Sequence, residues 1–340
     1  MTTHSPTDLT VPARGTRPPR GALIVANPTA GTFQETHLTE LTELCRVRPA
    51  PVEVRLTGGR GEATATVRDV LHGSGARPDL DLVIAVGGDG TVREVAEGLT
   101  EAGRTPSAAL FIVPLGTGNS GYRALWGVRP WQEALSAVLT GDGDRAVVRR
   151  LDLARLAQTG APVLLGACSG LVAQALATAR TLPLTGHARY RRAYRETAEA
   201  FVPYPGRVTV DGTVLHEGGT VLANVGGGRH RGGQYLLLPR SELDDGLLDV
   251  CVIGDEVAPA DVPELTRDGE HLGRPGVHYG RGRRITVERL DGRPLVFEHD
   301  GELQQERWDR MTLEVLPHAL PVWCASGAAT GPGRAHADRP

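Results

Sequence analysis

The chain has 340 residues, of which 40% are hydrophobic, so it is long enough to bury two separate cores and predicts a two-domain protein. Its formal net charge is −3 and its arginine clusters alternate with acidic residues, which argues against a broad basic face for nucleic acid. The N-terminal segment lacks the apolar core of a signal peptide, and no apolar run approaches the ~20 residues that span a bilayer. We therefore expect a cytoplasmic protein that does not bind nucleic acid.

The basic residues of this chain are unusual because all 37 are arginine. Without lysine there is no Walker A loop, no strand lysine of the protein-kinase type and no Schiff-base chemistry. Any phosphate must therefore be bound by backbone amides, arginine or a metal ion. The four cysteines show no CxxC spacing and are interpreted as reduced packing residues. They are Cys45, Cys168, Cys251 and Cys324.

Short apolar strands alternate with helical patterns in the first third of the chain. The predicted strands cover residues 22–26, 52–56, 81–86 and 109–113, and the predicted helices cover 33–46, 61–73, 91–101, 118–126 and 130–139. This order is typical of a parallel sheet with helices on its faces. It predicts an α/β domain at the N-terminal end.

The pattern changes after about residue 146 to strand-like runs separated by turn signals. These runs cover 208–215, 220–225, 247–253, 284–290 and 294–301, with helical stretches at 171–181 and 187–201. They predict a second, β-rich domain with an antiparallel, sandwich-like sheet. We expect flexible tails at 1–20 and 326–340, an α/β domain over 21–147 that residues 316–325 rejoin, and the β-rich domain over 148–315.

Three glycine-rich loops follow predicted parallel strands: NPTAG at 27–31, GGDGT at 87–91 and PLGTGN at 114–119. Ligands of open α/β sheets bind beyond the carboxyl ends of the strands, where helix N-termini favour anions. Glycine lets the backbone approach a phosphate closely and adopt positive φ. Phosphate would repel Asp89, so its presence in such a loop indicates a nearby metal ion or donor hydroxyl.

The three loops, in this order and with Glu94 after the second, resemble the diacylglycerol kinase catalytic-domain family, which includes bacterial lipid kinases and sphingosine kinases. Two later stretches, at 222–250 and 298–302, resemble the family's Asp-Asp-Gly and Asp-Gly-Glu motifs. The resemblance runs from about residue 21 to 325. NAD kinases and phosphofructokinases share GGDGT but not the other motifs.

The resemblance implies ATP and Mg²⁺ as cofactors and an active site in the cleft between the two domains. Asp300 matches the general base, Asp89 helps to hold the catalytic Mg²⁺, and Asp152 matches a second acid of that network. Asp245 and Glu302, with backbone carbonyls near Glu242 and Leu247, match a second, structural Mg²⁺ site. The residues implied around the nucleotide are Asn27, Pro28, Thr29, Ala30, Gly31, Thr57, Gly87, Gly88, Asp89, Gly90, Thr91, Glu94, Gly116, Thr117 and Asn119.

Each acidic residue also has a purely structural interpretation. Asp89 and Asp300 could be Asx-turn residues, 244–246 a hairpin turn and Asp152 a cap. His299 does not complete a Ser-His-Asp triad, because the chain has no GxSxG elbow, and we expect a strand residue with its ring outward.

Two residues depart from the family's patterns. Ser120 stands where the bacterial lipid kinases have Asp, which removes one carboxylate, and Gln174 lies near the acid that pairs with the amine of a sphingoid base. Helix 186–201 lies where the family builds a wall of the acceptor pocket. Its arginines face an anionic membrane or acceptor, or else it is a solvated helix whose aromatic residues pack inward. They are Arg189, Arg191, Arg192 and Arg195, among Tyr190, Tyr194 and Phe201.

We predict an ATP- and Mg²⁺-dependent kinase of an alcohol, with a diacylglycerol-like lipid as the favoured acceptor. A soluble metabolite or natural-product alcohol is the alternative acceptor. A non-catalytic nucleotide-binding regulatory protein is the alternative of another class, favoured by Ser120 but not by Asp89, Asp300 and Glu302. A homodimer and peripheral contact with an anionic membrane are further expectations.

Overall fold

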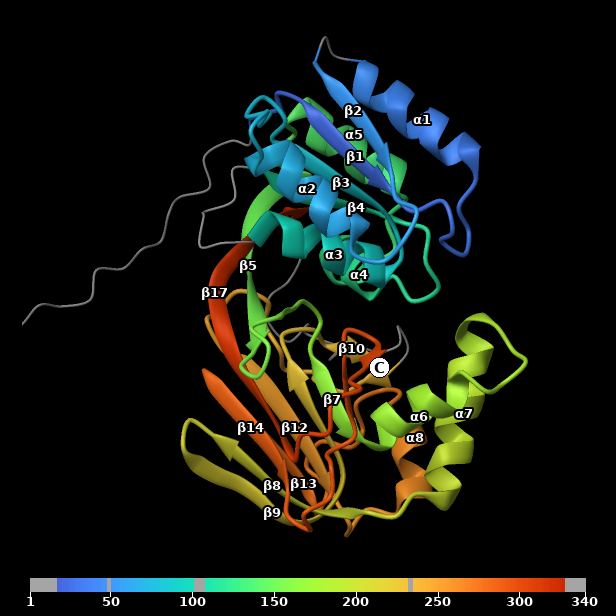
Figure 1. Cartoon of the computed structure of the whole chain (residues 1–340), viewed down its shortest axis with the longest axis vertical. Coiled ribbons are helices and arrows are strands. Elements are labelled where there is room, and N and C mark those ends of the chain that lie inside the picture. Colours follow the sequence, from blue (N-terminus) through green and yellow to red (C-terminus); the bar gives the residue numbers. More distant parts are fainter. Residues whose placement is uncertain (1–16, 48–49, 101–107, 232–234, 328–340) are drawn as a thin grey trace, which may run out of the picture.

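The computed structural model describes residues 17–47, 50–100, 108–231 and 235–327. The predicted tails fall largely on 1–16 and 328–340, which lie outside the described residues, as does residue 101 of a predicted helix. Figure 1 shows an N-terminal α/β domain above a C-terminal β-rich domain. Each domain has its own cluster of buried hydrophobic residues, as the length of the chain predicts.

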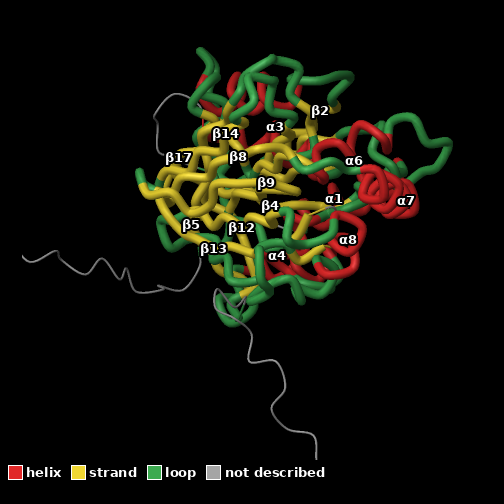
Figure 2. The backbone as a smooth tube through the Cα atoms, turned by 90° about the horizontal axis from the view of Figure 1, so that it is seen from below, coloured by secondary structure: helices red, strands yellow, loops and turns green. Residues whose placement is uncertain are grey.

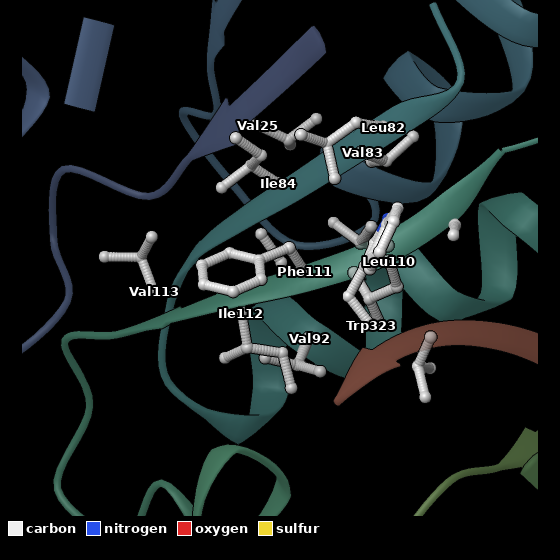
Figure 3. Close-up of a cluster of buried hydrophobic side chains, with 14 of the residues drawn as sticks. Val25, Leu82, Val83, Ile84, Val92, Leu110, Phe111, Ile112, Val113 and Trp323 are labelled. Carbon is white, nitrogen blue, oxygen red and sulfur yellow. The ribbon is translucent and has the colours of Figure 1, made fainter. Parts of the chain in front are cut away.

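The N-terminal domain contains a parallel sheet with the strand order β2-β1-β3-β4. Its strands are β1 (Ala22–Ala26), β2 (Val52–Leu56), β3 (Leu82–Gly87) and β4 (Ala109–Pro114). Its helices are α1 (Glu35–Arg46), α2 (Glu62–His72), α3 (Asp89–Thr100), α4 (Ser120–Trp126) and α5 (Trp131–Thr140). β1 and β3 are buried along their whole length, which explains their unbroken apolar sequences. Figure 3 shows Ile84 of β3 and Phe111 of β4 packed in the core near Trp323.

The C-terminal domain is built mainly from antiparallel strands. They are β5 (Ala146–Leu156), β6 (Pro162–Val163), β7 (Ala167–Gly170), β8 (Tyr204–Val210), β9 (Thr213–Gly226), β10 (His230–Arg231), β11 (Tyr235–Leu236), β12 (Leu248–Gly254), β13 (Val277–Gly282), β14 (Arg284–Arg289), β15 (Phe297–His299), β16 (Glu302–Leu303) and β17 (Arg310–Ala325). The helices are α6 (Leu171–Ala179), α7 (Gly186–Ala200) and α8 (Val262–Leu265), with the 3₁₀ turn η2 at Pro259–Asp261. Figures 1 and 2 show α6, α7 and α8 grouped on one side of the strands.

β5 and β17 connect the two domains. They pair antiparallel from Leu156 opposite Leu313 to Ala146 opposite Ala325, with an irregularity between Leu316 and Leu320. β17 also pairs with β14 of the C-terminal domain and, through Val322, with β4 of the N-terminal domain. Two paired strands therefore run from one domain into the other, as Figure 1 shows.

The structure corrects the predicted run at 208–215. This run is the hairpin between β8 and β9, which turns at Asp211 and Gly212 with φ angles of 48° and 86°. Asp-Gly favours such a turn because both residues tolerate positive φ. None of the described helices combines the length and apolarity that crossing a bilayer requires. All four cysteines are buried and free.

Candidate active site

Three loops meet at the carboxyl ends of β1, β3 and β4, and hydrogen bonds tie them together. The side-chain amide of Asn27, which follows β1, donates to the hydroxyl of Thr91 at 3.3 Å. The backbone amide of Thr32 donates to the carbonyl of Leu115 at 3.1 Å, which joins the first loop to the third. The three predicted loops therefore form one polar surface at the edge of the parallel sheet.

Two glycines let the second and third loops touch. A Cβ atom on Gly116 would lie 2.3 Å from the Cα atom of Gly88, much closer than real Cβ contacts. Asn119 holds the third loop closed, since its side chain accepts from the amide of Gly116 at 2.9 Å and donates to the carbonyl of Gly116 at 2.8 Å. Any residue other than glycine at position 116 would place a side chain between the two loops and push them apart.

Asp89 begins α3, and its carboxylate accepts from the amides of Ser120 and Gly121, both at 3.1 Å. These amides are at the start of α4, so Asp89 fixes the third loop to the second. The pKa of Asp89 lies above its ordinary value, chiefly because the carboxyl is buried and also because Asp300 is negatively charged nearby. The two amides offset part of this shift. Asp89 and Asp300 are therefore close enough to repel each other when both are ionised.

Asp300 lies just after β15, with its side chain 1% exposed and a φ of 49°. Its carboxylate accepts from the amides of Leu164, Leu165 and Gly166 at 2.9, 2.7 and 3.2 Å. Burial alone would raise the pKa of this carboxyl, but the adjacent His299 and the amides outweigh burial and hold the pKa below its ordinary value. The site therefore keeps Asp300 ionised although it is buried.

A cavity of about 380 Å³ lies between the two domains and brings Asp89 and Asp300 together. The N-terminal domain contributes the second and third loops to it. One wall is apolar or aromatic and comes from α6 and α7: Val172, Ala175, Leu176, Tyr190 and Tyr194. The cavity therefore joins a polar edge with two carboxylates to an apolar space.

Arginines bind two of the carboxylates that the resemblance assigns to a second Mg²⁺. Glu302 also lines the cavity, where it pairs with Arg60 and, at 3.1 Å, with Arg93. Asp245 does not line the cavity; it pairs with Arg281 and accepts from the amide of Leu247 at 3.1 Å. Glu242, which precedes Asp245 by three positions in the chain, is half-buried. No three or more His, Cys, Asp or Glu side chains converge on a metal position within the described ranges.

Asp152 is buried in the middle of β5, not at a loop-to-strand boundary. It accepts from the amide of Gly246 at 2.6 Å and from that of His318 at 2.7 Å. Burial raises its pKa and these two amides lower it. It ties the turn at 244–246 to the irregularity of β17 and does not line the cavity.

The other residues expected around the nucleotide lie at different depths. Gly90 and Thr117 line the cavity with Asp89. Pro28, Thr29 and Gly31 are exposed on the first loop, where Asn27 and Ala30 are half-buried, and Gly87 is buried at the end of β3. The first-loop residues do not line the cavity, and neither do Thr57 and Glu94. Thr57 is buried and bonded to the carbonyl of Ala26, and Glu94 accepts from the amide of Ala63 at the start of α2.

Sequence reasoning missed two buried charges at the cavity, Arg231 and Glu298, which are 7% and 3% exposed. Their signals are faint: Arg231 lies in a glycine-rich stretch, and Glu298 lies two residues before Asp300. It also missed Arg93, which lies two positions after the GGDGT loop. The expectation that His299 points outward is wrong, because β15 lies between β16 and β7 and His299 is only 6% exposed.

Two family profiles together match nearly all of the residues that the structure describes. The profile of the diacylglycerol kinase catalytic domain matches residues 21–151, and that of the YegS C-terminal NAD kinase beta sandwich-like domain matches 166–324. The chain belongs to the diacylglycerol kinase catalytic-domain family. As a member of this family, the protein is a phosphotransferase that acts on an alcohol.

Individual relatives match over most of their length. Lipid kinase YegS of Escherichia coli (strain K12) is 28% identical over 304 residues, which cover 83% of this chain and 89% of that protein. A protein of Stenotrophomonas maltophilia (strain K279a) named "Probable lipid kinase YegS-like" is 28% identical and covers 91% of this chain and 97% of its own. The crystal structure of a diacylglycerol kinase from Bacillus anthracis str. Sterne is 23% identical, has a TM-score of 0.62 and covers 89% of this chain and 96% of its own. That structure supports the fold.

Proposed function

We propose that this family enzyme transfers a phosphoryl group from ATP, with Mg²⁺, to the hydroxyl of a lipid alcohol of the diacylglycerol type. The observation that carries the proposal is the cavity between the domains, because Asp89 and Asp300 come to it from opposite domains and its far wall is apolar. Relatives named lipid kinases support the choice of a lipid. Asp300 acts as the base that takes the proton of the acceptor hydroxyl.

The three loops are the proposed site of the nucleotide phosphates. The chain has no lysine, so backbone amides of the glycine-rich loops and of the first turn of α3 supply the donors. The close contact between Gly88 and Gly116 leaves backbone rather than side chains at this surface.

Asp89 fits one divalent cation. Its carboxylate lines a cavity that also holds Asp300. Burial and, as a smaller cause, the negative charge of Asp300 raise its pKa, so a cation there would stabilise its ionised form. Carboxylate oxygens are the ligands that Mg²⁺ prefers, and the ion neutralises phosphate charge when bound. The arginine partners of Glu302 and Asp245 do not fit the second Mg²⁺, since they already balance both carboxylates.

α7 is the proposed contact with an anionic membrane. Arg191, Arg192 and Arg195 are exposed, whereas Tyr194 is buried against the C-terminal domain. Arg192 pairs with Glu196 on the same helix. Exposed arginines above an aromatic cavity wall favour an acceptor drawn from a negatively charged surface.

The decisive experiment measures ATP consumption with Mg²⁺ and a panel of dispersed lipids and soluble alcohols. We expect turnover with lipid alcohols, its loss on chelation of Mg²⁺, and turnover at least ~10²-fold lower in Asp300→Asn. Asparagine tolerates the positive φ of this position. Because its NH2 group cannot accept from a backbone amide as the carboxylate oxygens do, urea unfolding checks that the variant folds. Asp309→Asn, an exposed change at a residue that does not line the cavity, is the matched control.

Three outcomes would contradict the proposal. A near-parental rate of Asp300→Asn would mean that Asp300 is not the general base. Turnover of soluble alcohols alone would replace the lipid by the alternative acceptor. ATP binding without consumption on any alcohol would favour the non-catalytic nucleotide-binding protein.

A further inference from the structure

A row of side chains crosses the sheet beneath the apolar wall of the cavity. Glu298 of β15 lies opposite Cys168 of β7, and Cys168 lies opposite Asn224 of β9. Directly opposed residues of paired strands share one face of a sheet, so these three side chains lie on the same face. The row places a buried carboxylate and a buried amide beneath α6 and α7.

Arg231 of β10 joins this row. Its Nε atom donates to Oδ1 of Asn224 at 2.8 Å, and its Nη2 atom donates to the carbonyl of Val225 at 3.3 Å. Gly166 makes room for the guanidinium, since a Cβ there would lie 2.3 Å from Nη2. The guanidinium is therefore held in a fixed position at the cavity by groups of β9.

Arg231 and Glu298 both line the cavity without forming an ion pair within 4.0 Å, to judge from the residues described. Glu298 accepts a hydrogen bond from the amide of Gly301 at 2.8 Å, and Arg231 is bonded to neutral acceptors. Burying a charge costs several kcal/mol unless partners compensate for the lost water. A ligand that forms hydrogen bonds with both groups would therefore bind more tightly than a ligand that bonds to neither.

The chemistry of the two groups selects the ligand. A guanidinium only donates hydrogen bonds and an ionised carboxylate only accepts them, whereas a hydroxyl does both. Burial raises the pKa of Glu298, but a protonated carboxyl still has an oxygen that accepts, so a hydroxyl suits either form. An ester carbonyl would satisfy Arg231 alone, and a methylene group would satisfy neither. A free hydroxyl is the simplest group that satisfies Arg231 and Glu298 together.

We infer that Arg231 and Glu298 bind a second free hydroxyl of the acceptor, so that the preferred acceptor is a diol or polyol on an apolar chain and not an alcohol with one hydroxyl. This inference rests on the proposed transfer to a lipid alcohol and changes the acceptor within that class, because a diacylglycerol has one free hydroxyl and would leave the second position unfilled. The reactive hydroxyl lies at Asp300, two residues along the chain from Glu298. At ~30 Å³ for each water-sized group, the cavity of about 380 Å³ holds the head of such a molecule and the beginning of one chain.

The test uses two acceptors that differ by one hydroxyl, hexadecane-1,2-diol and hexadecan-1-ol, in the same mixed micelles. We expect kcat/KM of the parental enzyme to be at least ~10-fold higher for the diol, because the simple alcohol offers Arg231 and Glu298 no hydrogen bond beyond those that they make within the protein. Glu298→Gln and Arg231→Gln should each bring this ratio close to one. Glu217→Gln, an exposed change in β9, is the matched control and should keep the parental ratio.

Equal kcat/KM values for the two acceptors in the parental enzyme would overturn the inference, whatever the variants do. The thermal shift gives a second reading that needs no turnover: the diol should raise Tm of the parental protein more than the simple alcohol does. Equal shifts would again overturn the inference. Absence of turnover on every alcohol would instead contradict the proposed function, so the two failures are distinguishable.

Discussion

Asp249 illustrates at the scale of one residue how the fold changes the chemistry of a side chain. It is fully buried on β12, where the hydroxyl of Tyr279 donates to its carboxylate at 2.7 Å. Burial raises its pKa from 3.8 to about 6, although the hydrogen bond from Tyr279 lowers it. Between pH 4 and 6 the folded protein therefore holds a proton at Asp249 that the unfolded chain has released.

This proton gives a prediction for stability. Because the folded state binds more protons in this range, the free energy of unfolding should fall as pH rises from about 4 to 6 and stay level above it, by up to about 3 kcal/mol from this residue. Asp249→Asn cannot ionise, so the difference between parent and variant should change across the range. Urea unfolding at several pH values measures this difference. Parallel curves for the two proteins would contradict the raised pKa.

The cavity's residues differ in how far the sequence predicts them. Asp89 and Asp300 lie in short motifs, so their chemistry is visible in a few consecutive letters, and the structure brings both to the cavity. Asn224 and Glu298 face the same space only because β7 lies between their strands. The sequence does not state this register, and the arginine partners of Glu302 come from the other domain. Such partners follow from the fold and could not be read from local patterns.

At the scale of elements, the contact between the second and third loops depends on glycine. Gly116→Ala would bring a Cβ atom to 2.3 Å from the Cα atom of Gly88 and 3.1 Å from Oδ1 of Asn119. The loops must separate, so we expect KM for ATP at least ~10-fold higher and stability lower by about 1 to 3 kcal/mol.

Steady-state kinetics and urea unfolding check this prediction. Gly75→Ala is the matched control, because a Cβ there meets nothing within 4 Å and the residue has no positive φ. A Gly116→Ala enzyme with parental KM for ATP would mean that the two loops do not share the nucleotide.

Periodicity predicts the N-terminal domain better than the C-terminal one, for a physical reason. Each strand of the parallel sheet is a short apolar run beside a helix close in sequence, and the observed strands and helices agree with the prediction to within a few residues. β5 was not predicted, because Arg149 and Arg150 interrupt its apolar pattern and its partner β17 lies more than 150 residues away in the chain. Strands that are paired with distant partners leave a weaker local signal.

At the scale of the whole molecule, the two domains are joined by backbone on one side and by charge on the other. β5 and β17 run between the domains, and across the cavity Glu302 of β16 binds Arg93 of α3 and Arg60. The side chains of Arg93 and Glu302 are only 12% and 28% exposed, whereas Arg60 is 78% exposed. The pair between Arg93 and Glu302 should therefore carry most of the charged contact between the domains.

A double-mutant cycle of Arg93→Gln and Glu302→Gln tests this contact. Since both charges are largely shielded from water and ions, we expect a coupling of about 1 kcal/mol in the free energy of unfolding, retained in part at high salt. The pair of Arg207 and Glu217, which are 39% and 50% exposed within one hairpin, is the control and should couple by no more than about 0.5 kcal/mol. Breaking the pair should also let the domains move apart, which small-angle scattering measures as a larger radius of gyration for Glu302→Gln and an unchanged one for Glu217→Gln. Additive effects of the two substitutions, with an unchanged radius, would mean that β5 and β17 alone set how the domains enclose the cavity.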